Sequence, residues 1–196
     1  MSARRNIILR GPRVSLGLID ERDVPSFVRW MSDLEMTMNL GNYGFIPTPE
    51  NETEWIRAGL KNDKNRLFGI VLNRGTRHIG NCGLHEIDMS SRDAMLGIAI
   101  GEKDCWGRGY GRESVRLLCD LGFNVLGLHS IHLTVFGFNV RGIKAYEAVG
   151  FREAGRLREA RRYGTQWVDS IYMDILEEEF RARWESVVPG VTREPR

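Results

Sequence analysis

Apolar and polar residues alternate over short stretches in the first half of the chain, which is the pattern of half-buried β-strands. The stretch IILRGPRVSLGLI (7–19) predicts a first strand. The stretch RLFGIVLNRGTRHIGNCGLHEID (66–88) predicts two strands joined by a hairpin turn around Asn73 to Gly75. AMLGIAIG (94–101) is apolar almost throughout, so we expect a strand that is buried on both faces.

Helical spacing of apolar residues follows in other segments, and capping residues mark where helices begin and end. Asp20 is a candidate cap for the first helix, Asn139 for the last, and Gly150 is a candidate stop. The predicted helices run from Glu21 to about Met31, from near Pro49 onward, from about Gly109 to Val125, and from Asn139 to Gly150. A strand at 129–136 separates the last two helices, and two more strands with a turn at Gly164 extend to Ile175.

These elements predict a mixed α/β sheet with helices on both faces. No internal repeat or low-complexity segment divides the chain, so we expect a single domain over 1–186. The last ten residues, VVPGVTREPR (187–196), contain two prolines and a glycine and predict a flexible C-terminal tail.

Composition narrows the class of partner. The chain has 196 residues, with 28 Lys and Arg against 26 Asp and Glu, and a net charge of +2. This balance gives no reason to expect nucleic acid or a membrane as a partner. The three cysteines are widely spaced, so we expect neither a disulfide framework nor a metal site. The apolar run near the N-terminus is too short for a signal peptide, and a cytoplasmic location is the default expectation.

A glycine-rich segment, CWGRGYGRES (105–114), precedes the helix predicted from Gly109. Free N–H groups at the start of a helix, together with its dipole, form an anion site, and glycines let a phosphate approach the backbone. The spacing of Gly107, Gly109 and Gly111 fits neither GxxxxGK[ST] nor GxGxxG, which excludes a P-loop and a Rossmann fingerprint.

A second motif, NVRGIKAYEAVGF (139–151), follows the glycine segment. Together with GIAIGEKDCWGRGYGRESVRLLCDLGF (97–123), it resembles the GNAT superfamily of acetyl-CoA-dependent N-acetyltransferases. More narrowly, the chain resembles the branch that contains ribosomal-protein N-terminal acetyltransferases and spermidine acetyltransferases. The resemblance implies the acyl-CoA N-acyltransferase fold, with a central, mostly antiparallel sheet, and acetyl-CoA as cosubstrate with no metal.

The resemblance also implies which residues hold the coenzyme. Backbone amides of the glycine loop would wrap the pyrophosphate, and the strand before the loop would pair with the pantetheine arm through a local splay of the sheet. Trp106 occupies a position where the family has Gln or Arg, and Asn139 matches a residue that bonds the pantetheine. The implied coenzyme-binding residues are Ile98, Ala99, Ile100, Trp106, Gly107, Arg108, Gly109, Tyr110, Gly111, Arg112 and Asn139.

The implied chemistry is direct attack of an amine on the thioester, with Tyr146 at the position that protonates the departing thiolate. Many relatives hold a basic carboxylate where this chain has Met95. Glu86 and His85 on the neighbouring strand are candidate substitutes, and Glu86 is our predicted catalytic residue beside Tyr146. Asp169 lies where relatives often have an acid, with a structural role as the alternative.

The acceptor is left open by the sequence. An α-amine of pKa near 7.8 is about one-seventh neutral at pH 7, far more than a lysine-like amine near 10.4. A site without a strong base therefore favours an α-amine, of a protein N-terminus or a small molecule, over a polyamine or aminoglycoside. A non-catalytic acyl-CoA-binding sensor is the alternative from another class, and a homodimer is an open option. We expect the loops at 33–50 and 88–93 to decide acceptor choice.

Overall fold

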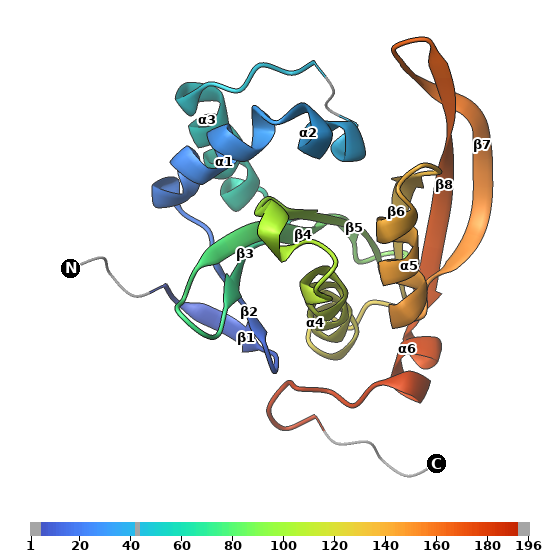
Figure 1. Ribbon diagram of the computed structural model, residues 1–196. Helices are drawn as coiled ribbons and strands as arrows, with labels where there is room; N and C mark the ends of the chain where they lie inside the picture. The colour runs from blue at the N-terminus through green and yellow to red at the C-terminus, as the bar shows by residue number, and fades with distance from the viewer. Residues whose placement is uncertain (1–4, 42–43, 192–196) are drawn as a thin grey trace.

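The computed structural model describes residues 5–41 and 44–191 (Figure 1). Within these residues a single eight-stranded sheet has the order β1-β2-β3-β4-β5-β6-β8-β7. All neighbouring strands are antiparallel except β5 and β6, which are parallel. The strands are β1 (Ile7–Arg10), β2 (Val14–Leu18), β3 (Arg66–Leu72), β4 (His78–Asp88), β5 (Asp93–Ile100), β6 (Ser130–Phe136), β7 (Arg152–Tyr163) and β8 (Gln166–Leu176). The predicted mixed, mostly antiparallel sheet is confirmed.

The first predicted strand, 7–19, is wrong as one element, because it folds into β1 and β2 with a tight turn between them. Gly11 N–H donates to the carbonyl of Val14 over 2.8 Å, which closes the turn. Pro12 in the middle has no N–H to donate to a ladder, so a continuous paired strand is excluded there.

Helices cover both faces of the sheet (Figure 1). They are α1 (Val24–Met31), α2 (Leu34–Leu40), α3 (Pro49–Lys61), α4 (Tyr110–Asn124), α5 (Val140–Val149) and α6 (Glu177–Arg183), with 3₁₀ turns at Glu21–Asp23 and Lys103–Cys105. Successive strand residues point to opposite faces, and Leu67 and Phe68 show the result. Leu67 packs in an apolar cluster with α1, α2 and α3, whereas Phe68 packs in a larger cluster with α4 and α6.

Helix α2 lies in the segment 33–50, which the sequence predicted as loop. Asp33 caps it by accepting hydrogen bonds from the N–H groups of Glu35 and Met36, and Gly41 ends it at a φ of 77°. A cap and a glycine stop were therefore both present in the sequence. The helix has only seven residues, too few for a periodic apolar pattern to stand out. Residues 42 and 43 of this segment lie outside the described residues.

Strands β5 and β6 pair only at their beginnings. Asp93, Ala94 and Met95 pair with Ser130, Ile131 and His132, and no later residues of the two strands are paired. The prediction that 94–101 is buried on both faces is wrong beyond the start of the strand. Ala94 and Leu96 are buried, but Gly97 through Ile100 are only half-buried. The strand is apolar because Ile98 and Ile100 pack on the larger cluster and Ala99 packs on the α1–α3 cluster, while its edge beyond Met95 borders the opening left by β6.

The C-terminal segment packs on the domain as far as it is described. Val187 N–H donates to the buried carboxylate of Asp120 over 2.7 Å, and Val187 and Val188 pack against the main core. The expected tail thus begins with two anchored residues, and its residues 192–196 lie outside the described part of the chain. The domain boundary stays a prediction. No described helix has the length and apolar character needed to cross a bilayer.

Candidate active site

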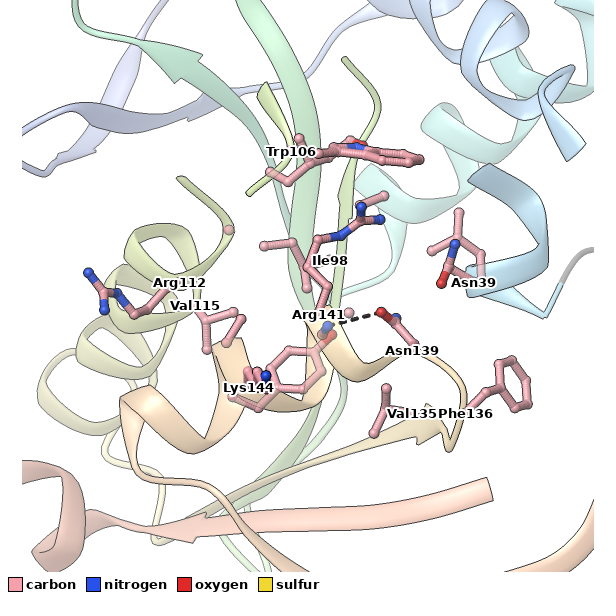
Figure 2. Close-up of a pocket in the computed structure, with 18 of the residues that line it drawn as sticks. Asn39, Ile98, Trp106, Arg112, Val115, Val135, Phe136, Asn139, Arg141 and Lys144 are labelled. Carbon is pink, nitrogen blue, oxygen red and sulfur yellow. Dashed lines mark hydrogen bonds between the residues drawn. The ribbon is translucent and has the colours of Figure 1, made fainter. Parts of the chain in front are cut away.

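A cavity of about 740 Å³ occupies the opening between β5 and β6 (Figure 2). It continues on both sides of the sheet, along the starts of α4 and α5 on one side and along α2 on the other. Its walls include Leu96 to Ile100 of β5 and Thr134 to Phe136 of β6, which are the residues where the two strands have parted. Of the predicted coenzyme-binding residues, all but Tyr110 line this cavity, and so does Tyr146. The other candidates, Glu86, His85 and Asp169, do not line it.

The glycine loop forms one end of the cavity. Gly107 and Gly109 have φ angles of 71° and 80°, in the left-handed region that glycine adopts without strain. Gly109 is the N-cap of α4, and its carbonyl accepts the first helical hydrogen bond, from Glu113. The N–H groups ahead of Glu113 therefore have no helical partner and form a backbone anion site. Gly111 lies in the first turn of α4, and a Cβ there would meet Ile100 at 3.6 Å, an ordinary contact, so the packing of the protein does not itself require glycine at this position.

Arg13 and Glu113 support this loop from beneath and were not found in the sequence. Glu113 is buried in the first turn of α4 and accepts hydrogen bonds from the N–H groups of Arg13 and Val14 and from Arg13 Nε. Arg13 Nη1 donates to the carbonyl of Arg108 over 2.9 Å, and the guanidinium lies 5.1 Å from the ring of Tyr110. Tyr110 thus points to Arg13 and contributes to the support of the loop from outside the cavity.

Trp106 gives the loop a second anchor. Its Nε1–H donates to the carbonyl of Ile100 over 2.6 Å, across the end of β5. The guanidinium carbon of Arg141, in the first turn of α5, lies 3.9 Å from the centre of the indole ring. Figure 2 shows the indole at one side of the cavity, above Ile98 and well separated from Val135. Trp106, at the position where the resemblance led us to expect Gln or Arg, therefore bridges β5 and α5.

Helix α5 carries Asn139 and Tyr146. Asn139 is its N-cap, and the side-chain oxygen accepts a hydrogen bond from Gly142 N–H over 2.9 Å, the dashed line in Figure 2. The cap and the stop at Gly150 are confirmed. Tyr146 lines the cavity and packs edge-on against Phe151, with ring centres 6.0 Å apart. Burial raises the pKa of Tyr146 to about 12, so the hydroxyl keeps its proton at neutral pH.

The candidate bases differ in position. Neither residue is itself part of the cavity wall. Glu86 is exposed at a β-bulge of β4 with a φ of 53°. His85 is half-buried and faces Gly97, where a methyl group on the glycine would lie 3.1 Å from His85 Nε2. Burial lowers the pKa of His85, against a smaller opposing effect of the Glu86 charge, so the imidazole is neutral at pH 7.

Asp169 contributes to the β7–β8 hairpin. Its carboxylate accepts hydrogen bonds from Glu159 N–H over 3.0 Å and from Arg156 over 3.3 Å. These two bonds lower the pKa of Asp169. They give the acidic residue at this position a structural role in the hairpin.

The charged side chains of the described cavity wall are all positive. Among the described residues that line it, five are basic and none is acidic. The basic residues are Arg108, Arg112, Arg141, Lys144 and Arg161. The first four belong to the glycine loop, the start of α4 and the first half of α5, and their charge is complementary to a phosphate-bearing ligand. The described loop residues between 88 and 93 contribute nothing to the wall.

Comparisons with known proteins agree with this geometry. Residues 13–152 match the family model described as an acetyltransferase (GNAT) domain. The uncharacterized N-acetyltransferase p20 of Bacillus licheniformis is 28% identical, over 86% of this chain and 95% of its own length. The uncharacterized N-acetyltransferase YnaD of Bacillus subtilis is 30% identical, over 79% and 91% respectively.

Solved structures show the same fold. Spermidine N-acetyltransferase from Vibrio cholerae, in complex with CoA and spermine, superposes with a TM-score of 0.80 at 22% identity. The superposition covers 87% of this chain and 99% of that one. An acetyltransferase of the GNAT family from Bacillus anthracis gives a TM-score of 0.75 at 21% identity, with the same shares covered. The parted strands, the glycine loop and the family match lead to one conclusion: the chain belongs to the GNAT acetyltransferase family and is an N-acetyltransferase.

Proposed function

We propose that this protein transfers the acetyl group of acetyl-CoA to a primary amine by direct attack within the cavity between β5 and β6. The observation that carries the proposal is that the glycine loop, the unpaired part of β5 and Tyr146 all border one cavity. Acetyl-CoA, when bound, supplies a thioester whose carbonyl carbon is open to an amine.

In this proposal the coenzyme end is mainly a backbone site. The free N–H groups at the start of α4 bind the pyrophosphate, and Arg108, Arg112, Arg141 and Lys144 balance the phosphate charges. The backbone of β5 beyond Met95, which has no β6 partner, pairs with the amides of the pantetheine arm and donates to the thioester oxygen as charge develops there. Support for this fit comes from the left-handed glycines and from the absence of any acidic group among the described wall residues.

Two protons must move. We assign the first to His85, which takes the proton of the attacking amine, because its neutral imidazole lies against Gly97 on the cavity wall. Glu86 stays the alternative predicted from the sequence. The second comes from Tyr146, whose hydroxyl gives its proton to the coenzyme thiolate as the carbon–sulfur bond breaks. The acceptor is an α-amine in this proposal, because α-amines have lower pKa values than lysine-like amines and a larger fraction of each is neutral at pH 7.

A second candidate, polyamine acetylation, is favoured by the likeness of the fold to spermidine N-acetyltransferase. A panel of amines assayed for release of free coenzyme thiol separates the candidates. Fast turnover of amino acids or peptides supports the α-amine. Faster turnover of spermidine overturns that ranking, and tight acetyl-CoA binding without turnover of any amine identifies a non-catalytic sensor.

A further inference from the structure

The cavity has a second end, away from the glycine loop, that the coenzyme chemistry leaves unexplained. On β5, Ile98 and Ile100 pack with the α4 core, whereas Ala99 packs with the α1–α3 cluster. Met95 and Gly97 alternate in phase with Ala99 and so face the same side as α2. This second end, here called the acceptor end, is lined by Met36, Asn39, Leu40, Gly41, Phe136 and Arg161. Figure 2 shows Asn39 and Phe136 on the side of the cavity opposite Arg112.

Arg161 is the charged residue of the acceptor end. It comes from β7, in the long hairpin that rises beside α2 (Figure 1). Its Nη1 donates to the carbonyl of Gly41 over 2.9 Å, and its guanidinium carbon lies 5.8 Å from the centre of the Phe136 ring. Tyr163 fixes the same hairpin end by donating its hydroxyl to the carbonyl of Met38 over 2.9 Å.

The charge of Arg161 has no counter-ion within the described residues. On the same strand, Arg156 does have carboxylate partners, Glu153 and Asp169, and these two acids lie outside the cavity wall. A carbonyl oxygen satisfies one donor but leaves the charge and the other N–H groups of the guanidinium available. Such a fork pairs with a carboxylate through two parallel hydrogen bonds.

Resting on the proposed function above, we propose that Arg161 binds a carboxylate of the acceptor. The acceptor is then a small amine that carries a carboxylate, as an amino acid does. The same charge repels a polyamine, because no acidic residue of the described wall is present to offset it. The inference therefore separates this chain from the polyamine acetyltransferases that share its fold.

The test compares amino acids with their methyl esters, which keep the amine and remove the carboxylate charge. Esterification also lowers the pKa of the amine. The ester should therefore react faster than the acid unless the protein recognises the carboxylate. With the full-length protein and saturating acetyl-CoA, we expect kcat/KM for the acids to exceed that for the esters by about tenfold or more. Spermidine should be the poorest of the three.

Variants assign the effect to Arg161. Arg161→Met should remove the preference for acids over esters while leaving the KM for acetyl-CoA unchanged. Arg161→Lys keeps the charge without the fork and should retain part of the preference. Arg158→Met, on the same strand and outside the cavity wall, is the matched control and should behave as the unchanged protein.

Each other outcome is decisive. Equal rates for acids and esters, or a preference that survives Arg161→Met, overturn the inference. Turnover of spermidine or of peptides without turnover of amino acids overturns it while leaving N-acetyl transfer intact. Absence of turnover with every amine overturns the proposed function, and this inference with it.

Discussion

The guanidinium of Arg141 stacks on the indole of Trp106, with 3.9 Å between the guanidinium carbon and the ring centre. This contact joins the glycine loop to the first turn of α5, and the hydrogen bond from Trp106 to the Ile100 carbonyl joins the same ring to β5. One side chain thus joins the glycine loop, β5 and α5, which border the same end of the cavity. The stacking interaction itself stabilises this arrangement by about 1 kcal/mol.

Replacing Trp106 by Ala should raise the KM for acetyl-CoA by about fivefold or more, because both the stacking and the hydrogen bond are lost. Trp106→Phe keeps an aromatic face for Arg141 and loses only the N–H donor, so its effect should be smaller. Initial rates against acetyl-CoA concentration measure both. A KM that does not change in either variant would show that the bridge is not needed for coenzyme binding.

Loss of Glu113 should destabilise the fold and the loop together. Glu113→Ala leaves the N–H groups of Arg13 and Val14 without their acceptor and should lower the free energy of unfolding by about 3 kcal/mol. Glu113→Gln keeps one acceptor oxygen and should lose less. Urea titration followed by tryptophan fluorescence measures the change. Equal stability of the two variants would contradict the importance of the buried acceptor.

Removal of the Tyr146 hydroxyl should lower kcat with little change in acetyl-CoA binding. We expect Tyr146→Phe to reduce kcat by about 100-fold, since the thiolate then departs without its proton donor. Because burial raises the pKa of Tyr146 to about 12, the hydroxyl stays protonated through neutral and mildly alkaline pH. Deprotonation of Tyr146 is therefore not expected to lower kcat below pH 10. A kcat for the variant near that of the unchanged protein would exclude Tyr146 as the acid.

The base is tested by two neighbouring substitutions. His85→Gln should reduce kcat/KM by about 100-fold, whereas Glu86→Gln should leave most of it, because only His85 contacts the cavity wall at Gly97. Burial lowers the pKa of His85, so the imidazole is neutral at pH 7. We expect the rate to fall only below pH 6.5, where the imidazole becomes protonated. The Glu86 charge raises this pKa, and Glu86→Gln should move the acid limb of the pH profile to lower pH. The reverse pattern of losses would support the base that the sequence predicted.

The residues that the sequence could predict lie in local motifs. Gly109 must take a left-handed conformation, and Asn139 must cap a helix, and both requirements depend on a few neighbouring letters. The support beneath the loop could not be found this way, because Arg13 and Glu113 are one hundred positions apart and meet only through the pairing of β2 with the rest of the sheet. Neither residue type, taken singly, marks such a pairing.

The position of Glu86 relative to the cavity was hidden from the sequence for a related reason. Glu86 and His85 are adjacent, and strand alternation alone would place one of them on each face. The bulge after His85 breaks the pairing with β5 before Asp88 and turns Glu86 outward at a positive φ, which an acidic residue seldom adopts. A single sequence carries no clear signal for such a bulge, whereas the structure resolves it at once.

The two ends of the cavity are drawn from separate parts of the chain. The end at the glycine loop offers main-chain N–H groups, which the protein keeps when a wall side chain such as Arg112 is replaced. The other end consists of side chains from α2, with Phe136 of β6 and Arg161 of β7. Under the proposed function, substitutions at the acceptor end would change which amine is modified while the binding of acetyl-CoA stays the same. A protein built in this manner is suited to diversification by point mutation, with the hairpin as the tunable part.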